Sequence, residues 1–357
     1  MPDLDLRRSS VDLTRTLCDI PSVSGEETVL ADAIERAVRA LPHLTVERHG
    51  DTVIARTDLG RARRVAIAGH IDTVPVHENL PVREREEDGE RVLWGRGTVD
   101  MKAGVAVQLV LAAQLAAPRV DVTWMWYDHE EVDAASNGLT RLASTRPDLF
   151  AADFAILGEP TQGRIEGGCN GNLRAVVRAH GRRAHSARSW MGENAIHAAG
   201  GILDRLARYR AREVVVDGLT YREGLNAVRI RGGVAGNVIP DLCEVEVNHR
   251  FAPSTDPAAA EEHLRGVFDG FELEVVDVAA GARPGMDAPL AREFAAAVGG
   301  PVRAKLGWTD VARFGGLGIP AVNYGPGDPA LAHHDDERVP TAQIEDVERG
   351  LRAWLTD

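Results

Sequence analysis

The segment Val65-Ala66-Ile67-Ala68-Gly69-His70 is a short apolar run that ends in a histidine, with Asp72 two residues further along the chain. Two later runs have the same form and also end beside polar groups, at 120–126 and 154–157. Residues 104–116 are strongly apolar and long enough for a buried helix between the first two of these runs. Strands that alternate with helices at this spacing are typical of a parallel α/β sheet.

The domain organisation follows from length and from a change of pattern along the chain. A chain of 357 residues exceeds what one hydrophobic core usually organises, so two domains are expected. Segments 172–179 and 243–251 alternate like half-exposed antiparallel strands, and 194–209 reads as an amphipathic helix. The sequence therefore predicts an α/β domain formed by 1–168 and 284–357, with an α+β domain inserted at 169–283.

Elements at the two ends of the α/β domain are also predicted. Helices are expected over 9–20, 26–41 and 341–355, with Ser24 as the N-cap of the second. The charged segment 78–91 reads as a surface excursion or a hairpin.

Composition narrows the class of protein. The formal net charge of −13 disfavours nucleic-acid binding. Residues 1–20 hold no apolar core of a secretory signal, and no run of about 18 apolar residues suggests a membrane span. Cys18, Cys169 and Cys243 are far apart, which predicts reduced, mostly buried thiols and a cytoplasmic location.

Five predicted strand or loop ends carry a carboxylate or an imidazole. Taken singly, each has an ordinary explanation, since an Asp before a helix is usually an N-cap and a Glu pair is usually solvated. Open α/β sheets, however, build their sites at the carboxyl ends of strands, so the joint placement predicts one site. The candidate residues are His70, Asp100, Glu131, Glu159 and His333.

A ligand set of imidazoles and carboxylates without thiolate suits zinc, cobalt or manganese. Two metal ions about 3.5–4 Å apart need a bridging carboxylate, and Asp100 lies in the middle of the set. We expect His70 and Glu159 to complete one ion, and Glu131 and His333 to complete the other.

Two further acids have expected roles in catalysis. Glu130 is adjacent to a ligand and remains available as the general base for the attacking water. Asp72 is suited to accept the second imidazole N–H of His70 and so to fix its tautomer.

Several segments resemble motifs of the M20 family of metallopeptidases and deacylases, namely 69–75, 95–104, 130–131, 158–161 and 332–337. The resemblance implies a zinc-exopeptidase-like catalytic domain with a mixed, mostly parallel sheet, and an inserted dimerisation (lid) domain. It implies two divalent metal ions, zinc with cobalt as the alternative. The family's last motif places the ligand three residues before an Asp-Glu pair, which selects His333 over His334.

Parts of the inserted domain, together with 307–314 after it, resemble one group within this family, whose substrate is N-succinyl-LL-2,6-diaminopimelate, a precursor of lysine and cell wall. The segments concerned are 168–174, 183–188, 233–240 and 307–314. The resemblance implies a homodimer in which His185 reaches the partner's active site and stabilises the oxyanion. It also implies that Asn237, Arg250 and Thr309 contact the substrate.

The implied substrate has three carboxylates, and arginines on the cleft would suit them as bidentate clamps. A surface salt bridge is the alternative for each candidate. These candidates are Arg174, Arg188, Arg250 and Arg313.

Other functions remain open at this point. The metal motifs do not separate this reaction from that of another M20 enzyme, such as an acetylornithine deacetylase or an aminoacyl-dipeptidase. A catalytically silent binding protein on the same fold is a further alternative, against which the retention of all five ligands and Glu130 argues.

Overall fold

The computed structural model describes residues 3–356 and divides the chain into two compact units. The first unit contains the chain up to Gly167, Pro284–Arg303 and the chain from Thr309 onward, and the second contains Gly168–Arg283 and Ala304–Trp308. From the sequence, 304–308 was predicted to belong to the α/β domain. This segment joins the second unit because the Asn170 amide donates to the Leu306 carbonyl, and the Trp308 indole donates to the Ala280 carbonyl, each at 3.1 Å.

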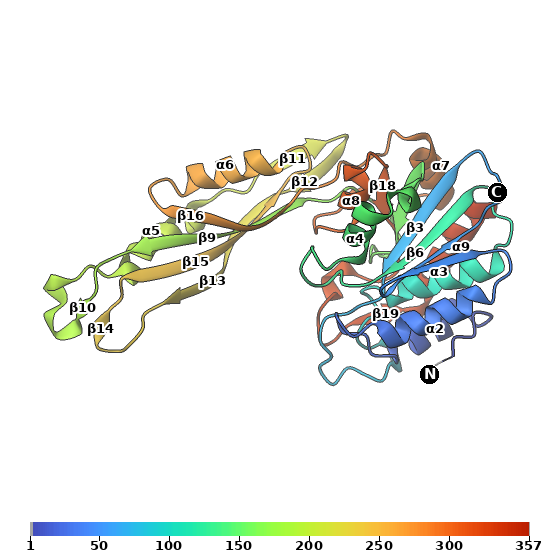
Figure 1. Cartoon of the computed structure of the whole chain (residues 1–357), viewed down its shortest axis with the longest axis horizontal. Coiled ribbons are helices and arrows are strands. Elements are labelled where there is room, and N and C mark those ends of the chain that lie inside the picture. The colour runs from blue at the N-terminus through green and yellow to red at the C-terminus, as the bar shows by residue number, and fades with distance from the viewer. Residues whose placement is uncertain (1–2, 357) are drawn as a thin grey trace. The chain divides into compact units, whose positions relative to one another are not determined.

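An eight-stranded mixed sheet forms the centre of the first unit (Figure 1). Its spatial order is β1 (Thr45–His49), β2 (Thr52–Arg56), β6 (Asp121–Tyr127), β3 (Arg64–His70), β7 (Phe154–Leu157), β18 (Ala321–Asn323), β8 (Glu166–Gly167) and β17 (Arg303–Ala304). Strands β6, β3, β7 and β18 run parallel, so their carboxyl ends share one edge. The α/β class with a mostly parallel centre, predicted from the alternating runs, is therefore confirmed.

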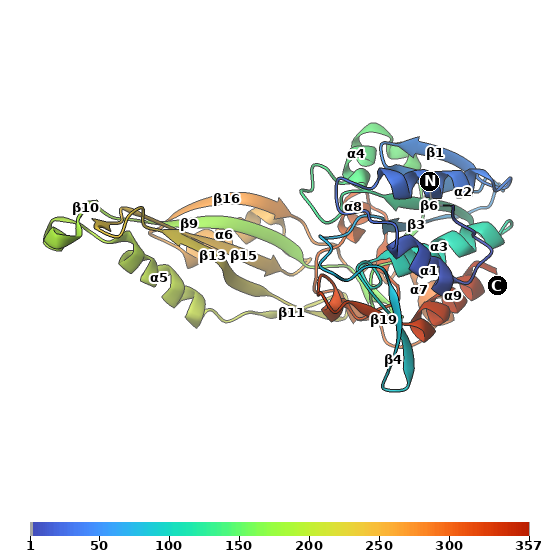
Figure 2. The same cartoon turned by 90° about the horizontal axis from the view of Figure 1, so that it is seen from below.

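Helices cover both faces of this sheet, which explains why β6 and β7 are buried along their whole lengths (Figures 1 and 2). One face carries five helices around a shared hydrophobic core. They are α1 (Ser10–Cys18), α2 (Thr28–Arg39), α3 (Lys102–Gln114), α7 (Pro289–Val298) and α9 (Thr341–Thr356). The opposite face carries α4 (Gly138–Thr145), η1 (Pro147–Phe150) and α8 (Val311–Gly316). There, the rings of Phe150 and Phe314 pack with centroids 5.4 Å apart.

A three-stranded sheet links the region before Asp100 to the region after His333. The hairpin β4 (Arg83–Glu87) and β5 (Glu90–Trp94) forms where a hairpin was expected, and β19 (Arg338–Pro340) pairs antiparallel with β5. This pairing brings together two loops that are far apart in sequence.

The predicted N-cap of α2 is wrong. The helix begins at Thr28 with Glu27 at the N-cap position, and no side chain caps it. Ser24 instead donates its hydroxyl to Asp72 at 2.6 Å, and its N–H donates to the Thr73 carbonyl at 3.1 Å. The turn before α2 is therefore attached to the loop that follows β3.

The second unit is an antiparallel sheet covered on one face by two helices. Its strands, in spatial order, are β13 (Gly224–Gly232), β15 (Leu242–Phe251), β9 (Gly171–His180) and β16 (Glu272–Ala279). Side chains of β9 and β15 alternate between buried and more exposed, as predicted, and the buried set packs with α5 (Ala195–Arg208) and α6 (Pro257–Val267). Two small ladders complete it: β10 (Ala184–His185) with β14 (Val238–Ile239), and β11 (Glu213–Val216) with β12 (Leu219–Arg222).

Among residues 3–356, no helix combines the length and the apolar character needed to cross a membrane.

Candidate active site

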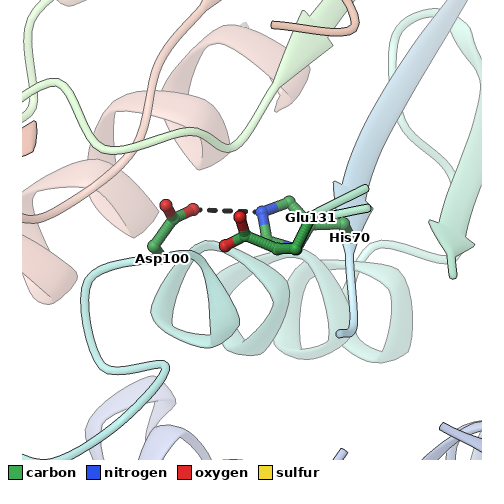
Figure 3. A group of neighbouring side chains, drawn as sticks. All are labelled: His70, Asp100 and Glu131. Atoms are coloured by element: carbon green, nitrogen blue, oxygen red, sulfur yellow. Dashed lines mark hydrogen bonds and ion pairs between the residues drawn. The ribbon is translucent and has the colours of Figure 1, made fainter. Parts of the chain in front are cut away.

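Four of the five predicted ligands meet at the edge where the parallel strands end. His70 is the last residue of β3, Glu131 lies in the loop after β6, and Asp100 lies just before α3. Ligand atoms of these three residues all lie within 4.8 Å of one another (Figure 3). The fourth residue, His333, comes from the loop between β18 and β19.

Asp100 lies between the two histidines. Its Oδ1 is 3.0 Å from Nε2 of His70, and its Oδ2 is 3.3 Å from Nε2 of His333. Nε2 of His333 is also 2.9 Å from Oε2 of Glu131. One carboxylate therefore presents a different oxygen to each imidazole, as a carboxylate that bridges two ions must do.

The adjacent histidines at the last motif differ in what they contact. His333 has a positive φ of 66° and directs its ring to the carboxylates of Asp100 and Glu131. His334 contributes its backbone carbonyl, which accepts a hydrogen bond from the Arg96 guanidinium at 3.3 Å.

Glu130 and Glu159 lie in the same acidic surroundings. Burial raises the pKa of Glu130 well above its usual value, and although the charge of His70 opposes this, the charges of Asp310, Glu159 and Glu131 add to it. Glu159 follows β7 and is buried. Its charge is one of those that raise the pKa of Glu130.

Asp72 contacts His70 and also holds groups that the sequence did not predict. Nδ1 of His70 lies 3.0 Å from the backbone carbonyl oxygen of Asp72 and 3.5 Å from its carboxylate. The carboxylate accepts the N–H groups of Glu130 and Glu131, both at 3.0 Å, and the hydroxyl of Ser24. Asp72 thus orients the His70 ring chiefly through its main chain, and its side chain holds the Glu130-Glu131 backbone.

The donor chemistry of the cluster fits divalent metal ions. Hydrogen bonds to Asp100 and Glu131 raise the pKa of His333 to about 10. Burial opposes protonation of His70, yet hydrogen bonds to Asp100 and Asp72 outweigh it and raise its pKa well above the ordinary value. The carboxylates therefore favour positive charge where the two imidazoles meet them, and a divalent cation would supply that charge with neutral imidazoles as ligands.

His185 and Asn237 are brought together in the second unit by the β10–β14 ladder. His185 pairs with Val238, and the Asn237 carbonyl accepts the N–H of Ser186 at 2.9 Å. Nδ1 of the exposed His185 ring accepts the N–H of Ala187 at 3.0 Å. A neutral ring that accepts at Nδ1 carries its proton on Nε2, so this side chain is set up as an Nε2–H donor.

The predicted arginine clamps have varied surroundings. Arg174 forms ion pairs with Glu246 at 3.6 Å and with Asp277 at 3.4 Å, which matches the salt-bridge alternative. Half-buried Arg250 donates from Nε to the side chain of Asn248 at 3.2 Å. Arg188 is exposed in the η2 turn (Ser186–Met191).

Two of the residues predicted to contact the substrate, Thr309 and Arg313, lie in the first unit. The Thr309 hydroxyl donates to the side-chain oxygen of Asn323 at 2.9 Å and is buried. Arg313 donates to the carboxylate of Asp310, which also accepts from the Asn137 amide at 2.9 Å. The sequence did not single out Asn137 or Asp310, because neither follows a predicted strand end and no local pattern shows that their side chains meet.

Comparisons with known proteins agree with this geometry. Residues 66–356 match the model of peptidase family M20/M25/M40. A DapE protein of Mycobacterium tuberculosis, whose assignment as a succinyl-diaminopimelate desuccinylase is provisional, is 56% identical over 355 residues, which is 99% of each chain. Succinyl-diaminopimelate desuccinylase of Corynebacterium glutamicum is 50% identical over 367 residues, covering 100% of this chain and 98% of that one.

The fold has a solved counterpart at low sequence identity. A Staphylococcus aureus tripeptidase superimposes with a TM-score of 0.78 at 20% identity, covering 99% of this chain and 98% of that one. The family resemblance seen in the motifs around His70 and Asp100 is thus confirmed over nearly the whole chain. This chain is a member of peptidase family M20/M25/M40, and it is an enzyme of that family.

Proposed function

We propose that this chain is a succinyl-diaminopimelate desuccinylase, which hydrolyses N-succinyl-LL-2,6-diaminopimelate to succinate and LL-2,6-diaminopimelate. The choice of substrate is supported by near-full-length identities of 56% and 50% to relatives with that name. The hydrolytic chemistry is supported by one observation above others: the Asp100 carboxylate shared between His70 and His333, with Glu130 adjacent to Glu131. Another M20 deacylase or peptidase activity is not favoured by these relatives.

The proposed metal ligands are those expected from the strand ends. Two divalent ions, zinc or cobalt, would be held by five residues: Asp100 would serve both ions, His70 and Glu159 would complete one, and Glu131 and His333 would complete the other. Their imidazole and carboxylate donors, and the raised pKa of both histidines, support this set. When bound, the ions supply Lewis-acid activation of water and of the substrate amide.

The proton transfers are assigned to Glu130. Its carboxylate takes a proton from the attacking water and returns it to the departing amine nitrogen, so that one group acts as base and then as acid. A carboxylate that is partly buried among other acids takes up a proton readily, which supports this role. The Asp72 carboxylate keeps Glu130 in place by accepting the backbone N–H of Glu130.

The inserted unit is proposed to form a homodimer and to supply His185 to the partner's site. Strand β13 is an edge of its sheet, with backbone groups available to a second copy. Large apolar side chains on β13 and α5 are 41% to 56% exposed, namely Val228, Ile230, Ile196 and Leu203. The Nε2–H of His185 would then stabilise the developing oxyanion, with Asn237, Arg250 and Thr309 as substrate contacts. We also propose a cytoplasmic location, supported by the burial of all three cysteines.

An assay panel tests the substrate. Zinc-loaded protein is given N-succinyl-diaminopimelate, N-acetylornithine and simple dipeptides, and kcat/KM is compared. We expect the succinylated substrate to be strongly preferred. A higher kcat/KM for either of the others would move the function to the alternative.

A further inference from the structure

A buried ion pair joins the loop that carries Asp100 to the loop that carries His333. Arg96 is 3% exposed and Glu337 is 0% exposed, and the guanidinium nitrogen of Arg96 lies 2.7 Å from Oε2 of Glu337. The two residues come from motifs 241 positions apart in sequence. Neither touches substrate or metal in the function proposed above.

The other oxygen of Glu337 holds the main chain at Asp100. Oε1 accepts the N–H of Val99 at 2.8 Å and the N–H of Asp100 at 3.0 Å. The backbone carbonyl of Glu337 accepts the N–H of Gly95 at 2.9 Å. The segment that presents Asp100 is therefore attached at three points, Gly95, Val99 and Asp100, to one residue of the last motif.

Arg96 extends the same connection to two further loops. Its Nε donates to the carbonyl of Pro75, in the loop after His70, at 3.2 Å, and its Nη1 donates to the carbonyl of His334 at 3.3 Å. The loops of His70, Asp100 and His333 thus share one guanidinium. Close approach of these loops requires glycine at position 97, where φ is +82° and a Cβ would lie 3.1 Å from the Thr73 methyl.

The free energy of the Arg96–Glu337 ion pair does not explain why it is buried. Moving two charges out of water costs free energy that their attraction often only offsets, and a pair of apolar residues of similar volume is frequently at least as stabilising. What an apolar pair lacks is the set of directed hydrogen bonds to Val99, Asp100, Pro75 and His334. Those bonds fix the main chain on both sides of the ligand cluster.

We propose that Arg96 and Glu337 are positioning residues that hold the Asp100 carboxylate between His70 and His333. This inference rests on the proposed function, in which Asp100 bridges two ions. Because the pair acts on the geometry of the ligands, its loss should weaken metal binding and change the coordination. A residue needed only for folding would not have that effect.

The informative variant is Glu337→Gln. The amide retains the shape but has one oxygen, so an NH₂ group must face either Arg96 or the two backbone N–H groups. We expect metal affinity, measured by competition with a chromogenic chelator, to fall by about 10- to 100-fold. We also expect the visible absorption spectrum of the cobalt-loaded protein to shift.

The second unit offers a closely matched control. Glu223 is also buried, accepts two bonds from Arg212 at 2.7 and 3.0 Å, and accepts the N–H of Ala252 at 3.1 Å. Glu223→Gln should lower the denaturation midpoint but leave metal affinity and the cobalt spectrum as in the wild type.

The outcomes separate this inference from the proposed function, because no substrate is used. Suppose that wild type and Glu337→Gln both bind two ions with equal affinity and have identical cobalt spectra. That result would overturn the positioning role and leave the enzyme assignment intact. If Glu337→Gln does not fold, Arg96→Lys replaces it; Lys keeps the charge but has a single nitrogen in place of the Nε and Nη1 that contact Pro75, His334 and Glu337. Wild-type metal affinity in that variant would likewise refute the inference. A wild-type protein that binds no metal would overturn both.

Discussion

Replacing Asp72 with Asn tests whether one buried carboxylate keeps the catalytic loop in place. In the wild type its two oxygens accept the N–H groups of Glu130 and Glu131 and the hydroxyl of Ser24. Asn has the same shape but a single acceptor oxygen, so at least one backbone N–H must face an NH₂ group. Because the site is buried, that N–H loses its partner.

The size of the effect can be worked out in two ways for the metal-free protein. A buried donor left without an acceptor costs about 1–3 kcal/mol. Independently, burial opposes ionisation of Asp72, yet the hydrogen bond and charge of His70 lower its pKa from 3.8 to about 2. That difference corresponds to about 2 kcal/mol of stability at neutral pH. Since the folded pKa is the lower one, this stability is complete above the unfolded pKa and is lost as pH falls towards 2.

Activity should fall further than stability alone would predict. A displacement of about 1 Å at a catalytic group can cost about 100-fold in rate, so we expect kcat of Asp72→Asn to fall by about that factor, with KM changed little. Metal content and the denaturation midpoint are measured on the same preparation.

Asp121 is the matched control for this substitution. It is also buried and accepts the Thr57 hydroxyl and the N–H groups of Leu59 and Arg61, all at 2.8 Å, but it lies at the start of β6, whereas Glu130 follows its end. Asp121→Asn should lose comparable stability and keep its kcat. Equal losses of kcat in the two variants would refute the assignment of Asp72 as the group that positions Glu130.

Three further outcomes follow from the proposed mechanism. Glu130→Gln should retain both metal ions, by elemental analysis, while kcat falls by about 10²–10⁴-fold; near-normal turnover would remove Glu130 as the base. His185→Ala should lower kcat by about 10²–10³-fold with metal content unchanged. Mixing this variant with Glu130→Gln should restore activity, because a mixed dimer has one site with both Glu130 and the His185 of the other subunit. If mixing restores no activity, His185 is not donated between subunits. Treatment with a chelator should abolish activity, and zinc or cobalt should restore it; full activity without metal would contradict the two-ion proposal.

Local pattern predicted much of the fold because the central strands are short, apolar and regularly spaced. Strands β3, β6 and β7 and helix α3 lie within a few residues of where their apolar runs placed them. The site edge followed from one general property of α/β sheets, applied to residues such as His70 and Glu131 that stand just after strand ends. Helix α6 and strand β16 were not predicted in the inserted domain, where α6 buries only Ala260 and Leu264 among its side chains.

Contacts between distant segments could not be predicted in the same way. Ser24 looked like a helix cap because Ser, in general, favours that position, but its hydroxyl binds Asp72, 48 residues away. Glu337 and Arg96 lie inside recognised motifs, but no role could be predicted for them, because nothing in either motif shows that the two side chains form an ion pair. The sequence could not show that the sheet register places Arg174 across from Asp277 and near Glu246, so its ion pairs were only one of two alternatives.

The acids of this site have different tasks that residue type alone cannot separate. Asp72 and Glu337 each accept two consecutive backbone N–H groups, and both are fully buried. Asp72 also lies 3.5 Å from Nδ1 of His70, whereas Asp100 and Glu131 direct their carboxylates to the Nε2 atoms of His70 and His333. An acid whose lone pairs are occupied by main-chain donors has little capacity left for a cation, whereas one that faces the Nε2 atoms of the cluster retains it. By this distinction, Asp72 and Glu337 position the loops and do not bind metal. It also explains why two further buried acids lie beside an already anionic cluster: they fix the main chain that carries the ligands.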